Sequence, residues 1–375
     1  MKRVNVKRLI FILALAVLMM AMAACKGEPE AEPTPEPTPA AEIIVMDALP
    51  VHSDSWEDIL NEEVEPPTPT PSVISSTSGR ERSAAAPYQP SFVCFDNDPD
   101  NWPLSGILEA DIVYEAPAAA GSGNTRLLAL FSDTYPAQTG PVGMAYSDFF
   151  ELQQEWGGMF LHQGYPADSG YPQMLADSAG QRVTNEGDAK THFFTPENAS
   201  GVFVHLDQLV AKLYAAKAAE EDVRFLLAEG YPYEQTDSAA KIKLPFGGGK
   251  TEAVEYVFDP EVGMYMRYQA NAAGRMTGVN ALSWNEEDEA LESVPLYVNN
   301  IVVQYVTVGD TGVKLTGTGA CDFFVNGLRI SGTWSKESLD APTYYYLENG
   351  NVVTLETGRT WIALHPADAK IEVTK

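Results

Sequence analysis

The stretch from Ala110 to Gly143 constrains the fold of this chain more than any other part of its sequence. It is the most apolar continuous piece beyond the N-terminal leader. It contains two runs of strand length, Ala110–Ala116 and Thr125–Ser132, that are rich in Val, Ile, Leu, Tyr and Phe. A segment of small residues, Pro117–Asn124, separates them. The sequence therefore predicts two buried strands that pair as an antiparallel hairpin.

Each predicted strand carries one charged residue inside its apolar run, Glu115 in the first strand and Arg126 in the second. A hairpin centred on Ala120 and Gly121 places these two side chains opposite each other, on a mostly apolar face. A carboxylate in such surroundings is costly unless a cation pairs with it. We therefore expect a buried ion pair between Glu115 and Arg126.

The N-terminus has the pattern of an export signal. Residues Met1–Arg8 carry four basic side chains, and Leu9–Ala23 is an uninterrupted apolar run. This run is too short for a comfortable membrane span and is typical of a secretory signal. It ends in Met22-Ala23-Ala24-Cys25, which resembles the bacterial lipobox. We expect residues 1–24 to be a signal peptide and Cys25 to carry palmitate and further acyl chains. The alternative is a plain secreted protein with an incidental cysteine.

Lipidation of Cys25 would hold the chain at the cell membrane, facing outside the cytoplasm, without a transmembrane helix. Residues 25–87 are rich in Pro, Glu and Thr and predict a disordered tether. Within it, Ile43–Leu60 contains Trp56 and is expected to be disordered, with a transient helix or a docking motif as the alternatives. The membrane, through Cys25, is thus the first expected partner.

The formal net charge of −28 argues against nucleic acid as a partner, since nucleic acid selects basic patches. It also argues against electrostatic adsorption to anionic lipid. A solvated acidic exterior explains the charge, and a surface that collects divalent cations is the alternative. An envelope polymer or a protein partner remains compatible with it.

The fold class predicted from element order is α+β. In residues 88–245 strand-like runs alternate with helical stripes, such as Leu206–Tyr214 and Ala218–Glu229, so we expect a layered mixed α/β domain. A glycine-rich boundary follows. Residues 251–372 show short strands joined by turn dipeptides, which predict a mostly antiparallel β domain.

Three local features have a structural explanation. The Asp-rich run 96–101 resembles a calcium loop, but Asn101 stands in place of the turn glycine and Ile107 in place of the bidentate glutamate, so an Asx-rich turn is predicted. Cys94 and Cys321 lie in strand-like runs and are expected to be buried thiols, with a disulfide as the alternative. No Cys/His cluster has zinc spacing, so no metal site is predicted from it.

Glu115, Arg126, His162 and His192 are the candidate ligand-binding residues, because all four lie in or near predicted strand ends. A histidine beside a buried carboxylate is suited to general acid–base catalysis, and two histidines with a glutamate can hold a metal. Histidines at strand ends also often satisfy backbone groups, and a Glu–Arg pair is often structural. The residues therefore do not decide whether the protein is an enzyme, and they name no catalytic group or cofactor.

Several motifs taken together resemble the YerB-like family of bacterial lipoproteins, a two-part domain of unknown function. In the first half they are residues 110–115, 125–131 and 140–142, the strand that ends at His162 and the loop at His192. In the second half they are residues 317–319, Gly327, Trp334 with Lys336, and 358–362. The resemblance covers most of residues 88–370 and implies layered β-sheets with helices.

The chain departs from the family pattern at two places. Members of the family commonly follow the Gly-Pro-Val turn with an Arg-Ser-Ala-Arg-like run, where this chain has Gly143-Met144-Ala145-Tyr146. The histidine loop usually carries an asparagine where this chain has Phe193. If the family arginines hold an anionic ligand, this chain lacks that contact.

Two functional hypotheses follow. The first is a membrane-tethered binding module for an envelope component or a protein partner. The second is an envelope hydrolase or metal-dependent enzyme that uses Glu115, His162 and His192. The aromatic residues of the second half, such as Trp334 and Trp361, either form a sugar- or peptide-binding face or pack in a sheet core.

Overall fold

The computed structural model describes residues 72–83, 88–117, 125–166, 182–183, 187–197, 200–214, 224–229, 233, 237–247, 253–271, 273–285, 290–309 and 312–375. The expected signal peptide, Cys25 and most of the expected tether lie outside these residues. Residues 68–375 form one compact unit, and every element below belongs to it.

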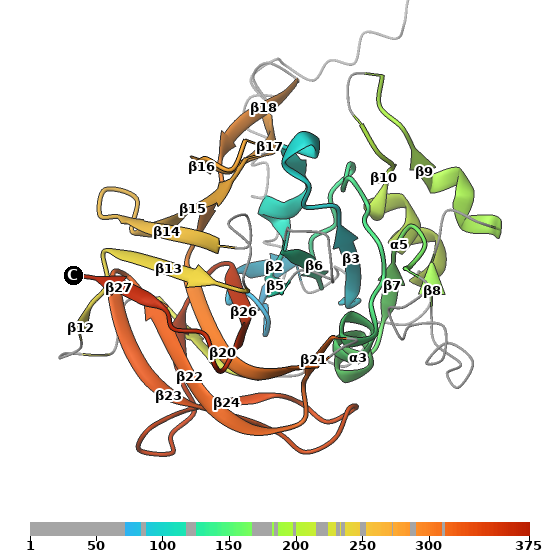
Figure 1. Ribbon diagram of the computed structural model, residues 1–375. Coiled ribbons are helices and arrows are strands. Elements are labelled where there is room, and N and C mark those ends of the chain that lie inside the picture. Colours follow the sequence, from blue (N-terminus) through green and yellow to red (C-terminus); the bar gives the residue numbers. More distant parts are fainter. Residues whose placement is uncertain are drawn as a thin grey trace, which may run out of the picture. The chain divides into compact units, whose positions relative to one another are not determined.

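A twelve-stranded sheet forms the centre of this unit (Figure 1). In spatial order its strands are β12 (Asp237–Ser238), β23 (Leu328–Lys336), β22 (Gly317–Val325), β20 (Asn300–Gly309), β26 (Thr360–Pro366), β5 (Ile112–Ala116), β6 (Arg126–Phe131), β3 (Ser91–Phe95), β7 (Met159–Leu161) and β8 (Arg182–Val183), with β21 (Gly312–Lys314) beside β20 and β24 (Tyr344–Leu347) beside β23.

Strand β26 joins the two halves of the chain in this sheet. It runs parallel to β20 on one side and parallel to β5 on the other. The sequence predicted an antiparallel meander for residues 251–372, and most of these strands do pair antiparallel, but the last strand of the main sheet inserts next to the first half. The sheet therefore crosses the boundary expected between residues 88–245 and 251–372.

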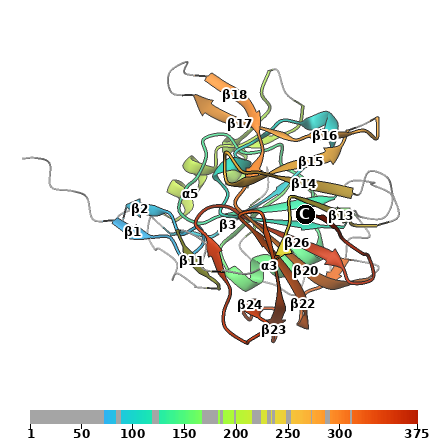
Figure 2. The ribbon, with the colours of Figure 1, turned by 90° about the vertical axis from the view of Figure 1, so that its left-hand side faces the viewer.

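Two smaller sheets accompany the main one, and Figure 2 shows β17 and β18 extending beyond it. One sheet contains β16 (Met276–Gly278), β15 (Met264–Ala270), β14 (Ala253–Asp259), β13 (Lys241–Pro245) and β27 (Glu372–Thr374), with β19 (Tyr297–Val298) beside β15. The other contains β18 (Ala290–Pro295), β17 (Asn280–Asn285) and β4 (Leu104–Ser105). Three strand pairs complete the β structure: β1 (Ser72–Ile74) with β2 (Glu81–Ser83), β9 (Phe193–Phe194) with β10 (Phe203–Val204), and β11 (Leu226–Ala228) with β25 (Thr354–Glu356).

The main sheet has an apolar core on each face, because side chains alternate along its strands. On β5, Val113 packs in the core shared with β13–β15, whereas Ile112 and Tyr114 pack in the core on the side of helix α3 (Ser147–Trp156). All residues of β5 and β6 are buried, as expected for strands covered on both faces.

The predicted fold class is wrong for the first half of the chain. The described residues contain two α-helices, α3 and α5 (Leu206–Tyr214), and three 3-10 helices, η1 (Pro99–Asn101), η2 (Ile107–Glu109) and η3 (Gly187–His192). Strands dominate, so the first half is not a layered α/β domain, whereas the predicted β character of the second half is confirmed. The helix predicted over Leu206–Tyr214 is confirmed as α5, but most of the described segments between the strands of the first half are turns, irregular segments and 3-10 helices. No helix among the described residues is long and apolar enough to span a bilayer.

The predicted helix Ala218–Glu229 is wrong in its described part, residues 224–229. Residues 226–228 form β11, which pairs in parallel with β25 from the second half. This long-range pairing outweighs the local helical pattern.

Residues 72–83 lie within the expected tether but form a hairpin bound to the main body. The Thr77 hydroxyl donates to Asp111 at 3.1 Å, and the backbone N–H of Gly358 donates to the carbonyl of Ser78 at 2.7 Å.

Candidate functional site

The hairpin of β5 and β6 exists as predicted, but its register differs from the expectation by one residue. Glu115 pairs with Leu127, and Ala116 pairs with Arg126. A shift of one residue moves a side chain to the opposite face of a sheet. Glu115 and Arg126 therefore point to opposite faces, and the predicted ion pair between them is wrong.

Glu115 forms its ion pair with Arg267 of β15, at 2.6 Å between Oε1 and Nη2. Both side chains are fully buried. Three further donors reach the same carboxylate, namely the hydroxyls of Thr125 and Tyr256 and the indole N–H of Trp361. A carboxylate offers about four acceptor sites, so these four bonds use its capacity.

Arg267 completes this buried arrangement. Burial disfavours its charge, but the charge of Glu115 offsets this and holds the pKa of Arg267 above its usual value. Its Nη2 also donates to Gln269 at 2.6 Å, and its guanidinium lies 5.1 Å from the ring centroid of Trp361. The ion pair between Glu115 and Arg267 joins the sheet that contains β15 to β5 of the main sheet, so its role is structural.

Arg126 pairs instead with Asp148 in the first turn of α3. Two parallel bonds join the groups, from Nη1 to Oδ1 at 2.8 Å and from Nη2 to Oδ2 at 2.7 Å. The Nε–H donates to the Pro117 carbonyl at 2.8 Å, and the guanidinium lies 4.3 Å from the Tyr146 ring centroid and 5.0 Å from that of Phe149. The guanidinium is thus fixed in position.

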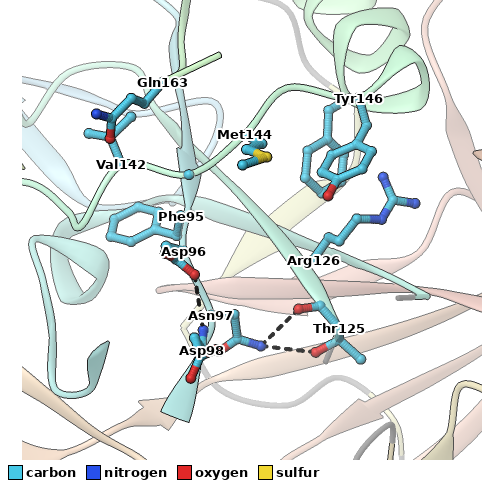
Figure 3. Close-up of a pocket in the computed structure, with 12 residues that line it drawn as sticks. Phe95, Asp96, Asn97, Asp98, Thr125, Arg126, Val142, Met144, Tyr146 and Gln163 are labelled. Carbon is cyan, nitrogen blue, oxygen red and sulfur yellow. Dashed lines mark hydrogen bonds between the residues drawn. The ribbon is translucent and has the colours of Figure 1, made fainter. Parts of the chain in front are cut away.

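A cavity of about 410 Å³ opens beside Arg126, and we call it the Arg126 cavity (Figure 3). Its polar lining residues are Asp96, Asn97, Asp98, Thr125, Arg126 and Gln163. Its apolar lining comes from Phe95, Val142, Met144, Tyr146 and Phe149, with the backbone of Gly143. Figure 3 shows the Asp96–Asp98 loop, Gln163 and the Tyr146–Arg126 pair on three different sides. The volume and the mixed lining fit a small-molecule site.

The loop after β3 is an Asx-rich turn, as predicted. The Asp96 carboxylate accepts from the N–H of Asp98 at 3.2 Å, and the Asp98 carboxylate accepts from the N–H of Asp100 at 3.0 Å. Asn101 donates to Asp96 at 3.0 Å. These bonds keep the two carboxylates of Asp96 and Asp98 at the cavity while they satisfy the turn.

Asn97 links the cavity to the buried ion pair. Its amide donates to the hydroxyl of Thr125 at 3.0 Å and to Gln269 at 3.0 Å. Thr125 in turn donates to Glu115, and Gln269 accepts from Arg267. One wall of the cavity is therefore held by a polar network that reaches the Glu115–Arg267 pair.

The two predicted histidines do not join Glu115. His162 is buried at the end of β7, its Nδ1 lies 3.0 Å from the Gly164 carbonyl, and it packs on Phe160 in the core next to α3. His192 ends η3 and is half-buried, and its carbonyl accepts from the N–H of His205. Burial, followed by the charge of Lys212, lowers the pKa of His192. Of the four candidates, only Arg126 lines the cavity.

Sequence reasoning missed Asp148 as the partner of Arg126 and Arg267 as the partner of Glu115. A signal for Arg267 exists in the alternation of β15, where Tyr265, Arg267 and Gln269 occupy the buried phase. A charged residue in the apolar phase of a strand needs an opposite charge. Nothing in the sequence says where that charge lies.

The cysteines behave as predicted, since Cys94 and Cys321 are both free and buried. Burial raises the pKa of both thiols well above the usual value, so neither is a reactive thiolate. Among the residues that the structure describes, no group of three or more His, Cys, Asp or Glu side chains is arranged to hold a metal ion. Cys25 lies outside the described residues.

Comparison with known proteins gives relatives of both halves. The model for the N-terminal domain of "Protein of unknown function (DUF3048)" matches residues 77–221, and the C-terminal model matches residues 242–362. "Putative lipoprotein YerB" of Bacillus subtilis is 29% identical over 192 residues, which span 48% of this chain and 54% of YerB. The chain thus aligns with about half the length of this curated relative.

A crystal structure of the YerB protein from Bacillus subtilis matches with a TM-score of 0.63 and 21% sequence identity, over 81% of this chain and 100% of that one. At this identity the match concerns the fold alone. Gly143, Met144 and Tyr146, which follow the Gly-Pro-Val turn, line the Arg126 cavity. The two domain models together cover more than half of the 375 residues, so the chain belongs to the DUF3048 family, whose function is unknown.

Proposed function

We propose that this chain is a lipoprotein held in the cell membrane through Cys25, facing outside the cytoplasm, and that it binds an envelope component, either a polymer or a protein partner, in the Arg126 cavity. The lipobox-like end of the leader and the description of the relative YerB as a lipoprotein support the anchor. The observation that carries the binding role is a cavity with polar groups on three sides, of which Asp96 and Arg126 are held in place by hydrogen bonds before any ligand arrives.

Preorganisation is the physical basis of this proposal. Arg126 has three of its five N–H groups bonded and stacks on Tyr146, so it loses little conformational freedom on binding. Asp96 is fixed by its turn, and Asn97 by the buried network. Such a site suits recognition, in which a rigid polar frame orients a ligand over an apolar floor.

The binding role is tested by filling the cavity. Met144 lines it and is 54% exposed, so Met144→Trp adds bulk without disturbing a core. The full chain in detergent is titrated calorimetrically with purified wall polysaccharide and peptidoglycan fragments. We expect binding to the natural chain and at least about tenfold weaker binding to M144W. Leu339→Trp is the matched control, because Leu339 is also exposed (43%) and does not line the cavity. Equal affinity of M144W and L339W would refute the cavity as the site.

The anchor is tested by metabolic labelling with a palmitate analogue. The natural chain should incorporate the label and stay with the membrane fraction, whereas Cys25→Ala should do neither. Label retained in C25A would show that acylation occurs elsewhere.

The alternative of a hydrolase or metal-dependent enzyme using Glu115, His162 and His192 stays a prediction. No contact among the described residues favours it. Both oxygens of Glu115 are engaged by four donors, and His162 packs in the core on the other face of the main sheet.

A further inference from the structure

The charges around the Arg126 cavity are unbalanced. Among the described residues that line it are two carboxylates, of Asp96 and Asp98, and one cation, Arg126. The charge of Arg126 is already matched by the bidentate bonds to Asp148. Among the described residues, neither Asp96 nor Asp98 forms an ion pair. The cavity therefore presents net negative charge above an apolar floor.

We propose that the Arg126 cavity selects a ligand that carries a protonated primary amine, as found in an unacetylated amino sugar or a lysine-like peptide side chain. The inference rests on the proposed binding function and specifies its ligand class. The ammonium group would lie at Asp96 and Asp98, and the body of the ligand would pack against Phe95 and Met144.

The geometry of the Asp96–Asp98 loop supports this assignment. Asp96 receives one bond on each oxygen, from the N–H of Asp98 and from the side chain of Asn101. One acceptor site on each oxygen stays available, since a carboxylate has about four. Asn97, between the two aspartates, turns inward and is almost fully buried, so both neighbouring carboxylates are left at the cavity.

Asp96 is partly buried, so of the two carboxylates, Asp96 and Asp98, it gains more from a bound cation. Desolvation is the main reason that the pKa of Asp96 is raised above its usual value. A carboxylate in this state gains more from a bound cation than a fully solvated one does. Ligand affinity should therefore fall as the solution is acidified through the pKa of Asp96.

Two other ligand classes fit less well. A hard divalent cation takes six or more oxygen ligands, and no cluster of three acidic or histidine side chains suited to a metal occurs in the described part of the chain. A phosphate or carboxylate ligand would approach Asp96 and Asp98, with only the already paired Arg126 to attract it. Like charges placed together disfavour binding.

The test uses matched ligand pairs that differ in one charge. The detergent-solubilised full chain is titrated with a glucosamine oligomer and its N-acetylated form, and with a lysine-containing tripeptide and its Nε-acetylated form. A galacturonate oligomer supplies the anionic case. We expect one amine to bind at least about tenfold more tightly than its acetylated form, and the pair that shows the difference identifies the source of the amine.

Variants locate the effect. Asp96→Asn and Asp98→Asn should each reduce the preference for the amine by about tenfold or more. Asp100→Asn is the matched control, because Asp100 belongs to the same loop but does not line the cavity. Circular dichroism and melting curves check that each variant is folded.

The outcomes separate this inference from the proposed function. Binding of an acetylated or anionic ligand at least as tightly as the amines, abolished in M144W, would overturn the amine preference and leave the binding function standing. If no ligand in the panel shows binding that is lost in M144W, both the amine preference and the proposed binding function would be overturned. Amine binding unchanged in D96N and D98N would also refute the assignment.

Discussion

Replacing Glu115 with Gln tests whether this residue is structural, as its contacts indicate. The change keeps the size of the side chain and removes its charge. Arg267, which is fully buried, then has no carboxylate partner. The new amide also places an N–H₂ group where donors point, either at Thr125 and Arg267 or at Tyr256 and Trp361.

The magnitude follows from burial. Breaking a buried ion pair by removing one partner costs about 3–5 kcal/mol, because the other charge stays in a low-dielectric site. Each donor left without an acceptor would cost about 1–3 kcal/mol, but this term overlaps with the first and is not added to it. Since domains are stable by only about 5–15 kcal/mol, E115Q should lose a large fraction of the free energy of unfolding.

Urea unfolding followed by tryptophan fluorescence measures this loss. Glu255→Gln is the matched control, since Glu255 forms an ion pair at 2.6 Å with Lys241, which is 45% exposed. Such a surface pair contributes about 0–1 kcal/mol. An E115Q protein within about 1 kcal/mol of E255Q would refute the reasoning.

A double-mutant cycle isolates the pair itself. Arg267→Met alone should also be costly, since Glu115 is then buried without a cation. The combined E115Q/R267M variant should be more stable than the sum of the single effects predicts, with a coupling energy of about 2 kcal/mol or more. Additive effects would show that the two charges do not depend on each other.

Two further predictions concern the parts that hold the cavity and the hairpin of residues 72–83. Burial, with the nearby charge of Asp133, raises the pKa of Asp111 from 3.8 to about 7, so the ionised form destabilises the fold. The natural protein should therefore lose up to about 3 kcal/mol of unfolding free energy, relative to Asp111→Asn, as pH rises from about 5 to about 8. Unfolding free energies of the two proteins that change with pH in parallel would contradict this. A Cβ on Gly143 would lie 2.7 Å from the backbone carbon and oxygen of Phe95, so Gly143→Ala should destabilise by about 1–3 kcal/mol in thermal melts. Gly309→Ala, whose Cβ would meet its nearest neighbour at 3.5 Å, is the control, and an equal effect of both would refute the packing argument.

Local pattern predicted the strands better than their arrangement. The runs that form β5, β6 and β7 are recognisable from their apolar content, and α5 from its helical stripe. The register of β5 with β6 was wrong because both strands are buried on both faces, and such strands lose the alternation that would fix register. The turn after β3 was predicted correctly, since Asx turns depend on residues next to each other in the chain.

The candidate site shows the same division between local and long-range information. Arg126 stands out in the sequence as a charge within an apolar run, whereas nothing in the sequence points to Asp148 as its partner. Glu115 was expected to need a cation, and it has one. That cation, Arg267, lies 152 positions away in a different sheet.

The sequence by itself predicts an export leader that ends at a lipobox-like cysteine, and it shows a Pro/Glu/Thr-rich segment and apolar strand-like runs that carry charges in need of partners. These properties depend on composition and on neighbours within a few residues. Only the tertiary structure decided that β26 runs beside β5, that Glu115 and Arg126 face opposite cores, and that a loop, a strand and a helix enclose one cavity. The pairing of strands and the face to which a side chain points both depend on contacts between distant segments. A register shift of one residue moves every side chain of a strand to the opposite face of the sheet.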